Sequence, residues 1–156
     1  MERLKRERGV GTPRAAGDSG RYVPVKDFVN ALARASEIRL TVIGRKSRRR
    51  ISVPVWFALE DDTLYSLPVN GSDTQWYRNV LKNPSIEVRA GRHRVSVKAK
   101  PVTDRRKVRK VIELFRESYG ASDVKRYYTK FDVAVAVPLS RARAVAARRR
   151  AGATGA

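Results

Sequence analysis

Hydrophobic residues recur at helical spacing in three stretches of the chain. In the first, VKDFVNALARAS, five apolar residues share one face, which predicts an amphipathic helix over 25–36. These five residues are Val25, Phe28, Val29, Leu32 and Ala33. A second helix is predicted over 73–83, because Ser72 or Asp73 can cap its start and Pro84 ends it.

The third and longest helix is predicted over 105–119. Thr103 or Asp104 can cap its first turn, and Gly120 is a residue type that commonly ends a helix. Its apolar stripe comprises Val108, Val111, Ile112 and Phe115. The sequence therefore predicts a long helix with one buried face.

Elsewhere the hydrophobic residues alternate with other residues, as in β-strands. Pro54 lies within one alternating run and cannot donate a ladder hydrogen bond, which places it at a sheet edge or a bulge. Asp61-Asp62 and Gly91-Arg92 mark hairpin turns, and Val95, Val97 and Ala99 are predicted to point inward. The predicted strands cover 38–43, 51–59, 63–69, 85–90, 93–102 and 131–139.

This order of elements predicts a mainly β, α+β fold. About six antiparallel strands with a few peripheral helices are typical of a small barrel. A chain of 156 residues suffices for one such domain. The organisation predicted is a basic disordered arm over 1–21, one folded domain over 22–140 and a disordered tail rich in Arg and Ala over 141–156.

The chain is strongly basic, and this charge favours anionic partners of several kinds. The chain has 35 basic and 15 acidic residues, and the segment 22–140 alone keeps 24 basic and 12 acidic ones. Such a field attracts nucleic acid, anionic lipid and phosphorylated small molecules alike. No apolar run approaches the roughly 20 residues of a membrane span, and the N-terminus has no apolar core of a secretory signal. The lack of Cys excludes disulfides and agrees with a cytoplasmic location.

The most unusual segment is the loop GRKSRRR, residues 44–50, between two predicted strands. Gly44 permits the turn, and the loop offers backbone N–H groups, the Ser47 hydroxyl and several guanidinium groups, which are the components of a phosphate site. Three interpretations stay open from the loop alone: a solvated basic hairpin, a nucleic-acid contact and the phosphate site of a cofactor.

A second segment, SLPVNGSDTQWYRN, leaves a strand through a Gly turn and enters a helix that carries Trp76, Tyr77 and Asn79. An aromatic ring system has room to rest there near backbone amides. No hydrolytic or metal site competes with this segment: His93 shares the parity of buried strand residues, and Asp61-Asp62 is a turn. The chain also contains neither GxGxxG nor GxxxxGK[ST].

Taken together, the order T-x-x-G-R-K-S, a strand with V-P and G-S-D-x-x-W-Y-x-N-x-x-x-N-P resembles the deazaflavin-dependent nitroreductase family. These proteins are split β-barrels related to pyridoxamine-phosphate oxidases, and they use the deazaflavin coenzyme F420. The resemblance extends from about Tyr22 to Leu139 and includes YYTKFDVAVAVPL. It implies an oxidoreductase that transfers hydride from reduced F420 to a quinone, a nitroaromatic or a similar acceptor, without a catalytic side chain or a metal.

The resemblance also implies the residues of the site. Those expected to bind the cofactor are Arg45, Lys46, Ser47, Arg50, Ser52, Val53, Pro54, Ser66, Leu67, Trp76 and Asn79. Those expected on the substrate side are Trp56, Tyr127 and Tyr128. Relatives usually have Gly after the serine, where Arg48 stands here, and often a cation where this chain has Val69-Asn70.

Two alternatives remain beside this interpretation. The same fold could bind flavin mononucleotide (FMN), which also presents a tricyclic ring and a phosphate. A basic nucleic-acid-binding barrel is the alternative from another class, but the aromatic residues cluster at a turn and not along an exposed sheet face. The basic arm leaves open a peripheral contact with an anionic membrane at the inner face, and a homodimer is also left open.

Overall fold

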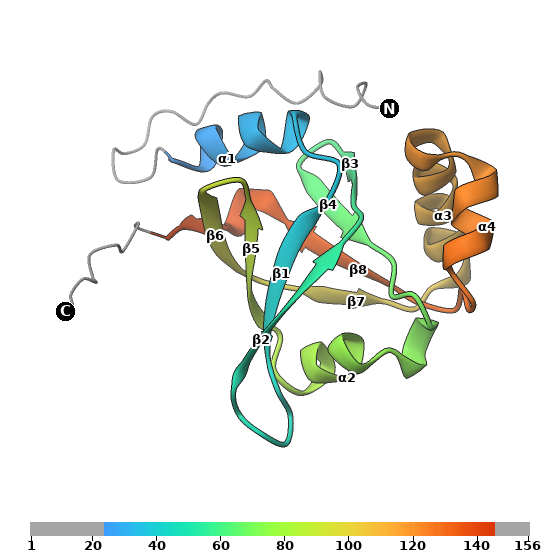
Figure 1. Ribbon diagram of the computed structural model, residues 1–156, viewed down its shortest axis with the longest axis horizontal. Helices are drawn as coiled ribbons and strands as arrows, with labels where there is room; N and C mark the ends of the chain where they lie inside the picture. The colour runs from blue at the N-terminus through green and yellow to red at the C-terminus, as the bar shows by residue number, and fades with distance from the viewer. Residues whose placement is uncertain (1–23, 146–156) are drawn as a thin grey trace.

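The computed structural model describes residues 24–145, which form two antiparallel sheets and four α-helices (Figure 1). The helices are α1 (Pro24–Ala33), α2 (Gln75–Lys82), α3 (Arg105–Tyr119) and α4 (Ala121–Tyr127). The strands are β1 (Ile38–Ile43), β2 (Arg50–Val55), β3 (Ala58–Glu60), β4 (Thr63–Ser66), β5 (Ser85–Ala90), β6 (His93–Lys98), β7 (Lys100–Val102), β8 (Ala134–Pro138) and β9 (Arg143–Ala144). Two short 3₁₀ turns are η5 (Gly71–Asp73) and η6 (Leu139–Arg141).

The first sheet has the order β2-β1-β5-β6-β9 and the second the order β3-β4-β8-β7. Their inner faces meet in one hydrophobic core, because alternate residues of each strand point inward. In β1 these residues are Ile38, Leu40 and Val42, and Val135 and Val137 of β8 belong to the same core. Helix α1 contributes Phe28 and Leu32 to this core. The mixed α+β fold and the split barrel are therefore confirmed.

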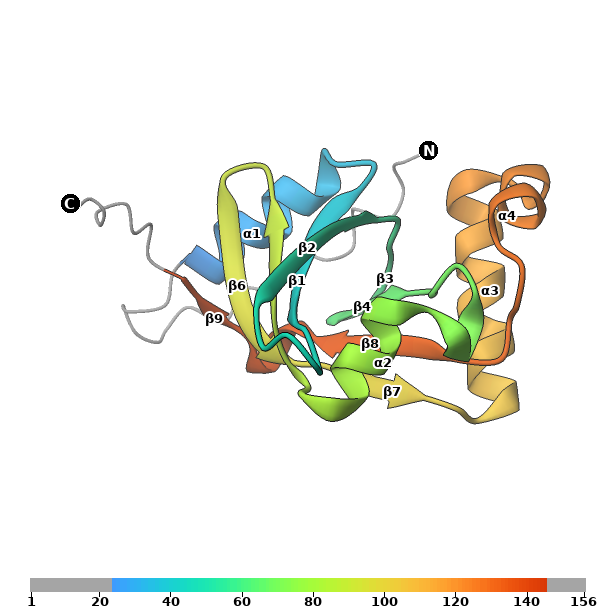
Figure 2. The same cartoon turned by 60° about the horizontal axis from the view of Figure 1, so that its bottom comes forward.

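A second core lies between the β3-β4-β8-β7 sheet and the pair α3 and α4, which stand side by side in both views (Figures 1 and 2). The stripe predicted for 105–119 is buried there, with Val111 and Phe115 fully covered. Asp104 caps α3, since its carboxylate accepts a hydrogen bond from the Lys107 amide. No helix in the part of the chain that the structure describes is long and apolar enough to cross a membrane.

The two predicted hairpin turns are confirmed. The turn Asp61-Asp62 joins β3 to β4 and Gly91-Arg92 joins β5 to β6, and both Asp61 and Gly91 have a positive φ. Residues 24–145 contain nine strands, however, and not about six, because β3, β7 and β9 are only two or three residues long. Alternation cannot be recognised in strands so short.

Two predicted elements end earlier than expected. The helix predicted over 25–36 ends at Ala33, because Arg34 and Ala35 donate to carbonyls three residues back and close a tighter turn. Ala33, the last residue of this helix, is exposed, although it was predicted on the buried face. The strand predicted over 93–102 breaks at Ala99, where the chain leaves one sheet for the other. The inward positions are nevertheless confirmed, because Val95, Val97 and Ala99 are all buried.

Two predicted boundaries also move. Helix α2 begins at Gln75 with Thr74 as its N-cap, and neither Ser72 nor Asp73 caps it. The segment 141–156 does not begin as a disordered tail: Arg143–Ala144 form β9 against β6, and the Val145 amide donates to the Arg94 carbonyl. The arm predicted over 1–21 and the residues 146–156 lie outside the described residues.

Candidate functional site

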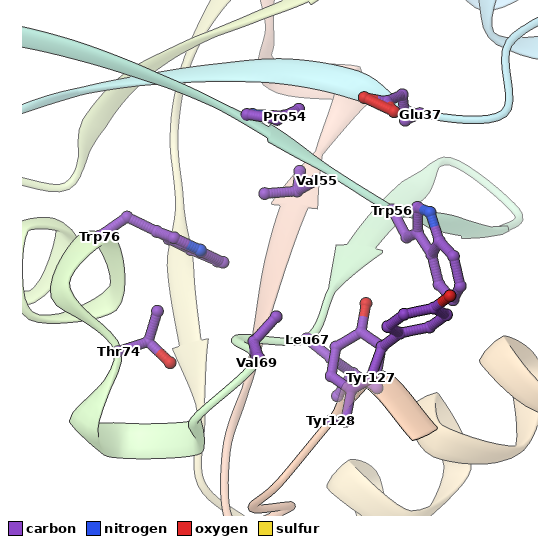
Figure 3. Close-up of a pocket in the computed structure, with 10 residues that line it drawn as sticks. All are labelled: Glu37, Pro54, Val55, Trp56, Leu67, Val69, Thr74, Trp76, Tyr127 and Tyr128. Atoms are coloured by element: carbon purple, nitrogen blue, oxygen red, sulfur yellow. The ribbon is translucent and has the colours of Figure 1, made fainter. Parts of the chain in front are cut away.

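A pocket of about 440 Å³ lies between the edge strand β2, the start of α2 and the end of α4 (Figure 3). Glu37 is the one charged residue among those that line it. The figure shows Thr74 and Trp76 on one side, and Trp56 and Tyr127 on the other. The lining residues are Glu37, Pro54, Val55, Trp56, Leu67, Val69, Thr74, Trp76, Tyr127 and Tyr128. An apolar, aromatic cleft of this kind suits a flat ring system.

The aromatic side of this pocket is built around Trp56. The Tyr119 ring stacks on the Trp56 ring with 4.1 Å between centroids and 8° between planes. The Tyr127 ring meets Trp56 edge-on at 5.7 Å, and the Tyr128 ring is tilted at 6.0 Å. Tyr127 is 49% exposed and Tyr128 only 6%. Burial raises the pKa of Tyr128 well above its usual value, so its hydroxyl stays protonated.

Tyr119 was missed by the sequence analysis, although it supports this wall. It is the last residue of α3, and its hydroxyl accepts from the Phe57 amide at 3.1 Å. The same hydroxyl lies 2.9 Å from the carbonyls of Ser36 and Phe57, to which it can donate. Burial raises the pKa of Tyr119 to about 12. Helix α3 is thereby tied to the segment where the chain passes from β2 to β3.

We expect Tyr119→Phe to lower the free energy of unfolding by about 1–2 kcal/mol, because it keeps the stacked ring and removes the partly buried hydrogen bonds of the hydroxyl with Phe57. Chemical denaturation would measure this change. Tyr127→Phe is the matched control, since that side chain is half exposed and should be nearly neutral. Equal stability of the two variants would show that the Tyr119 hydroxyl does not hold the wall.

The loop between β1 and β2 is closed by its own hydrogen bonds. The Gly44 amide donates to the Arg49 carbonyl at 2.8 Å, and the Arg48 amide donates to the Gly44 carbonyl at 2.9 Å. Arg48 has φ 65, and the Ser47 hydroxyl accepts from the Arg49 amide. A Cβ on Gly44 would lie 2.5 Å from Ser47 Oγ and 3.0 Å from Ile51 Cδ1, so a larger residue there would displace these two side chains.

Arg45 and Asn79, two of the predicted cofactor-binding residues, bind each other. Asn79 Oδ1 accepts from the Arg45 amide at 2.9 Å and from its guanidinium at 2.8 Å. The guanidinium also donates to Gln75 Oε1 at 2.8 Å. Gln75 and Asn79 belong to α2, as does Trp76, and the loop lies beside this helix (Figure 2). These contacts therefore attach the loop to the helix that carries one side of the pocket.

The other predicted residues divide into two groups. Pro54, Leu67, Trp76, Trp56, Tyr127 and Tyr128 line the same pocket. The remainder are absent from that lining: Ser52 lies 2.7 Å from the Thr41 hydroxyl, Arg50 pairs with Glu87 at 3.0 Å, and the Ser66 hydroxyl donates to the Trp56 carbonyl. Val53 is partly buried against the core. Glu37, Val55, Val69 and Thr74 line the pocket and were not predicted to do so.

Comparison with known proteins assigns this arrangement to a family. The model of the F420H(2)-dependent quinone reductase family matches residues 21–140. The chain belongs to this family. It is therefore an F420-dependent reductase, and coenzyme F420 is its cofactor. No protein with a curated description matches the chain.

Solved structures agree with the fold of this family. An F420-H2-dependent reductase is 20% identical, with a TM-score of 0.53 over 65% of this chain and 93% of its own. A conserved hypothetical protein from Mycobacterium tuberculosis is 19% identical, with a TM-score of 0.58 over 83% of this chain and 89% of its own. A pyridoxamine 5'-phosphate oxidase-like protein from Listeria innocua is 14% identical, with a TM-score of 0.51 over 78% of this chain and 97% of its own.

The residues present fit coenzyme F420. The pocket offers aromatic and apolar surface for its ring, and the loop beside α2 offers positive charge for its anionic part. Lys46, Arg48 and Arg49 are exposed there. Within the described residues, the amides of Lys46 and Ser47 have no hydrogen-bond acceptor. Two unpaired N–H groups next to cations form a suitable site for a phosphate.

Proposed function

We propose that this F420-dependent reductase uses the pocket for the deazaflavin ring and the 44–49 loop for the phosphate, and reduces a quinone or a similar electron-poor acceptor. The observation that carries the proposal is the attachment of the loop to α2. Through Arg45 it brings a cationic turn next to Trp76 and the apolar pocket. In this proposal the loop supplies positive charge for the anionic tail of coenzyme F420, and the neighbouring pocket supplies apolar surface for its ring.

Within this site, the loop residues have two different roles. Arg45 is held by Asn79 and Gln75, so its main task is to fix the loop. Lys46, Ser47 and their free amides then face the phosphate, and Arg48 and Arg49 add charge for the acidic tail. Arg50 is engaged by Glu87 and contributes to the general field.

The chemistry asked of the side chains is modest. When bound and reduced, coenzyme F420 supplies a hydride. The pocket residues orient the acceptor, and the wall formed by Trp56, Tyr127 and Tyr128 offers it a flat aromatic surface. Because the Tyr128 hydroxyl stays protonated, it can donate a hydrogen bond to an acceptor oxygen. The apolar lining keeps water away from the reacting atoms.

The test is a pair of titrations followed by turnover. We expect coenzyme F420 to bind more tightly than FMN, and its affinity to fall steeply with salt, because exposed ion pairs are screened. Cofactor fluorescence measures both effects. The reduced cofactor should then be oxidised by menadione, a soluble quinone, and a nitroaromatic compound serves as the second acceptor. Tighter binding of FMN without a salt effect would contradict the proposed mode of cofactor binding.

A further inference from the structure

Two segments distant in the sequence hold the rim of the pocket together. Residues 69–74 carry Val69 and Thr74, and residues 127–132 carry Tyr127 and Tyr128. Figure 3 shows Thr74 and the two tyrosines approaching the pocket from different sides, with Val69 between them. The width of the pocket at this rim therefore depends on how these two segments are joined.

Backbone and side-chain contacts join them at three successive points. The Thr129 amide donates to the Val69 carbonyl at 2.9 Å, and the Thr129 hydroxyl donates to Asn70 Oδ1 at 2.7 Å. Asn70 and Lys130 form an isolated parallel bridge. Asp132 then accepts two hydrogen bonds from Ser72, one from its amide at 2.9 Å and one from its hydroxyl.

At the last of these points, the Asp132 carboxylate lies in space that is free because residue 71 is glycine. Gly71 is buried with φ +55, and a Cβ on it would collide with Asp132 Oδ1 and lie 2.9 Å from Lys130 Cγ. Burial acts to raise the pKa of Asp132, but the hydrogen bonds from Ser72, together with its own backbone amide and the charge of Lys130, hold the pKa below the usual value of 3.8. The carboxylate is therefore ionised near neutral pH, when it accepts both bonds most strongly.

Salt bridges surround this contact on the solvent side. Lys130 Nζ lies 3.0 Å from Asp73 and 3.8 Å from Asp132, and Arg78 lies 3.0 Å from Asp73. Their side chains are exposed, so these pairs contribute little to stability. The hydrogen bonds of Ser72 with Asp132 are the directed part of the junction.

We propose that Asp132 is a positioning residue for the acceptor pocket. Through Ser72 it fixes the 69–74 segment against the end of α4, and so sets the distance between Val69 and Thr74 and the two tyrosines. The proposal rests on the proposed function, which places the acceptor against this aromatic wall. The Asp132 side chain is 39% exposed. Replacing it by alanine therefore leaves no cavity in the core and should affect the rim of the pocket more than the fold.

The test compares Asp132→Ala, Asp132→Asn and Ser72→Ala with the control Asp62→Ala, which removes an exposed carboxylate from the β3–β4 turn. Hydrogen exchange of the Ser72 and Thr129 amides reports the junction itself. Quenching of tryptophan fluorescence by menadione reports the pocket, because both tryptophans of the chain, Trp56 and Trp76, line it. The Michaelis constant for menadione and the dissociation constant of coenzyme F420 complete the set.

For Asp132→Ala we expect both amides to exchange faster. The Michaelis and half-quenching concentrations of menadione should rise about tenfold, because a less ordered rim holds the quinone less firmly. Affinity for coenzyme F420 should fall less than affinity for menadione, because the 44–49 loop that the proposed function assigns to its phosphate does not contact Asp132. The unfolding midpoint should stay close to that of Asp62→Ala. Asp132→Asn should recover part of the loss, since its amide oxygen can still accept from Ser72.

Unchanged exchange in Asp132→Ala would show that Asp132 does not hold the junction. Faster exchange with unchanged menadione quenching would show that the junction does not set the pocket. Either result overturns the proposal. If the wild-type protein oxidised no reduced cofactor with any acceptor, the proposed function would fail, while exchange and quenching would still decide the role of Asp132.

Discussion

Replacing Asn79 by alanine is expected to weaken the binding of coenzyme F420 by about 1.5–3 kcal/mol, the usual value of a hydrogen bond to a charged group. The Asn79 side chain does not need to touch the cofactor for this effect. Its Oδ1 accepts from both the amide and the guanidinium of Arg45, and Asn79 itself is only 5% exposed. Without that acceptor, the loop loses its main attachment to α2 and its phosphate site is no longer prearranged.

The chain offers a matched control in the same segment. Asn83 lies just after α2, and among residues 24–145 its side chain accepts only from the Ser85 amide, at 3.2 Å. Asn83→Ala should therefore leave cofactor affinity unchanged. Asn79→Asp keeps the acceptor oxygen and should retain most of the affinity. Fluorescence titration of the three variants measures the differences, and equal affinity of Asn79→Ala and Asn83→Ala would remove the loop from the cofactor site.

The pairing of Arg45 with Asn79 shows what sequence comparison leaves out. Resemblance to a family predicts both residues to bind the cofactor, and in the structure they bind each other at the foot of the loop. Their mutual hydrogen bond joins residues 34 positions apart, and no local pattern specifies such a contact. The sequence therefore predicted the composition of the loop, whereas the structure shows that one of its cations is already engaged by the helix.

The fold was predictable where burial imposes a regular period. In β1 and β5 the buried residues alternate as the sequence predicts, because each strand has a partner on both sides. In β2 the same alternation is present, and Ile51 opposes Val42, yet Ile51 is 38% exposed. That strand forms the edge of its sheet, and hydrophobic alternation alone does not tell an edge strand from an inner one.

Local capping rules failed at one place for a tertiary reason. Ser72 and Asp73 have the residue types of a helix N-cap, but Ser72 bonds to Asp132, 60 positions away, and Asp73 pairs with Lys130. Thr74 becomes the cap of α2 by position. The G-S-D element that contributed to the family resemblance therefore acts in this chain as a junction with the 129–132 segment, which capping preferences do not reveal.

The same junction predicts the largest loss of stability from a small substitution. We expect Gly71→Ala to lower the free energy of unfolding by about 2–4 kcal/mol, because two costs add. The φ of +55 is unfavourable for any residue with a Cβ, and the new methyl group would occupy the place of Asp132 Oδ1. Asp132 would have to move, and its hydrogen bonds with Ser72 would be lost.

A matched substitution at Gly91 separates the cost of backbone strain from the cost of crowding. It has φ +64, close to that of Gly71, but a Cβ added there meets nothing within 4 Å. Gly91→Ala should therefore cost only the backbone strain of about 1–2 kcal/mol. Denaturant unfolding of the two variants measures the difference, which is the contribution of the crowding around Gly71.

A double substitution identifies the group responsible for this crowding. In a protein that already carries Asp132→Ala, the carboxylate is absent, and Gly71→Ala should cost little more than Gly91→Ala does. Lys130 Cγ, at 2.9 Å, can move by rotation of its side chain, and Lys130 Cβ, at 3.1 Å, needs to shift by only a few tenths of an ångström. If Gly71→Ala remained equally destabilising without Asp132, the buried turn itself, and not its contact with the carboxylate, would be the reason for glycine at this position.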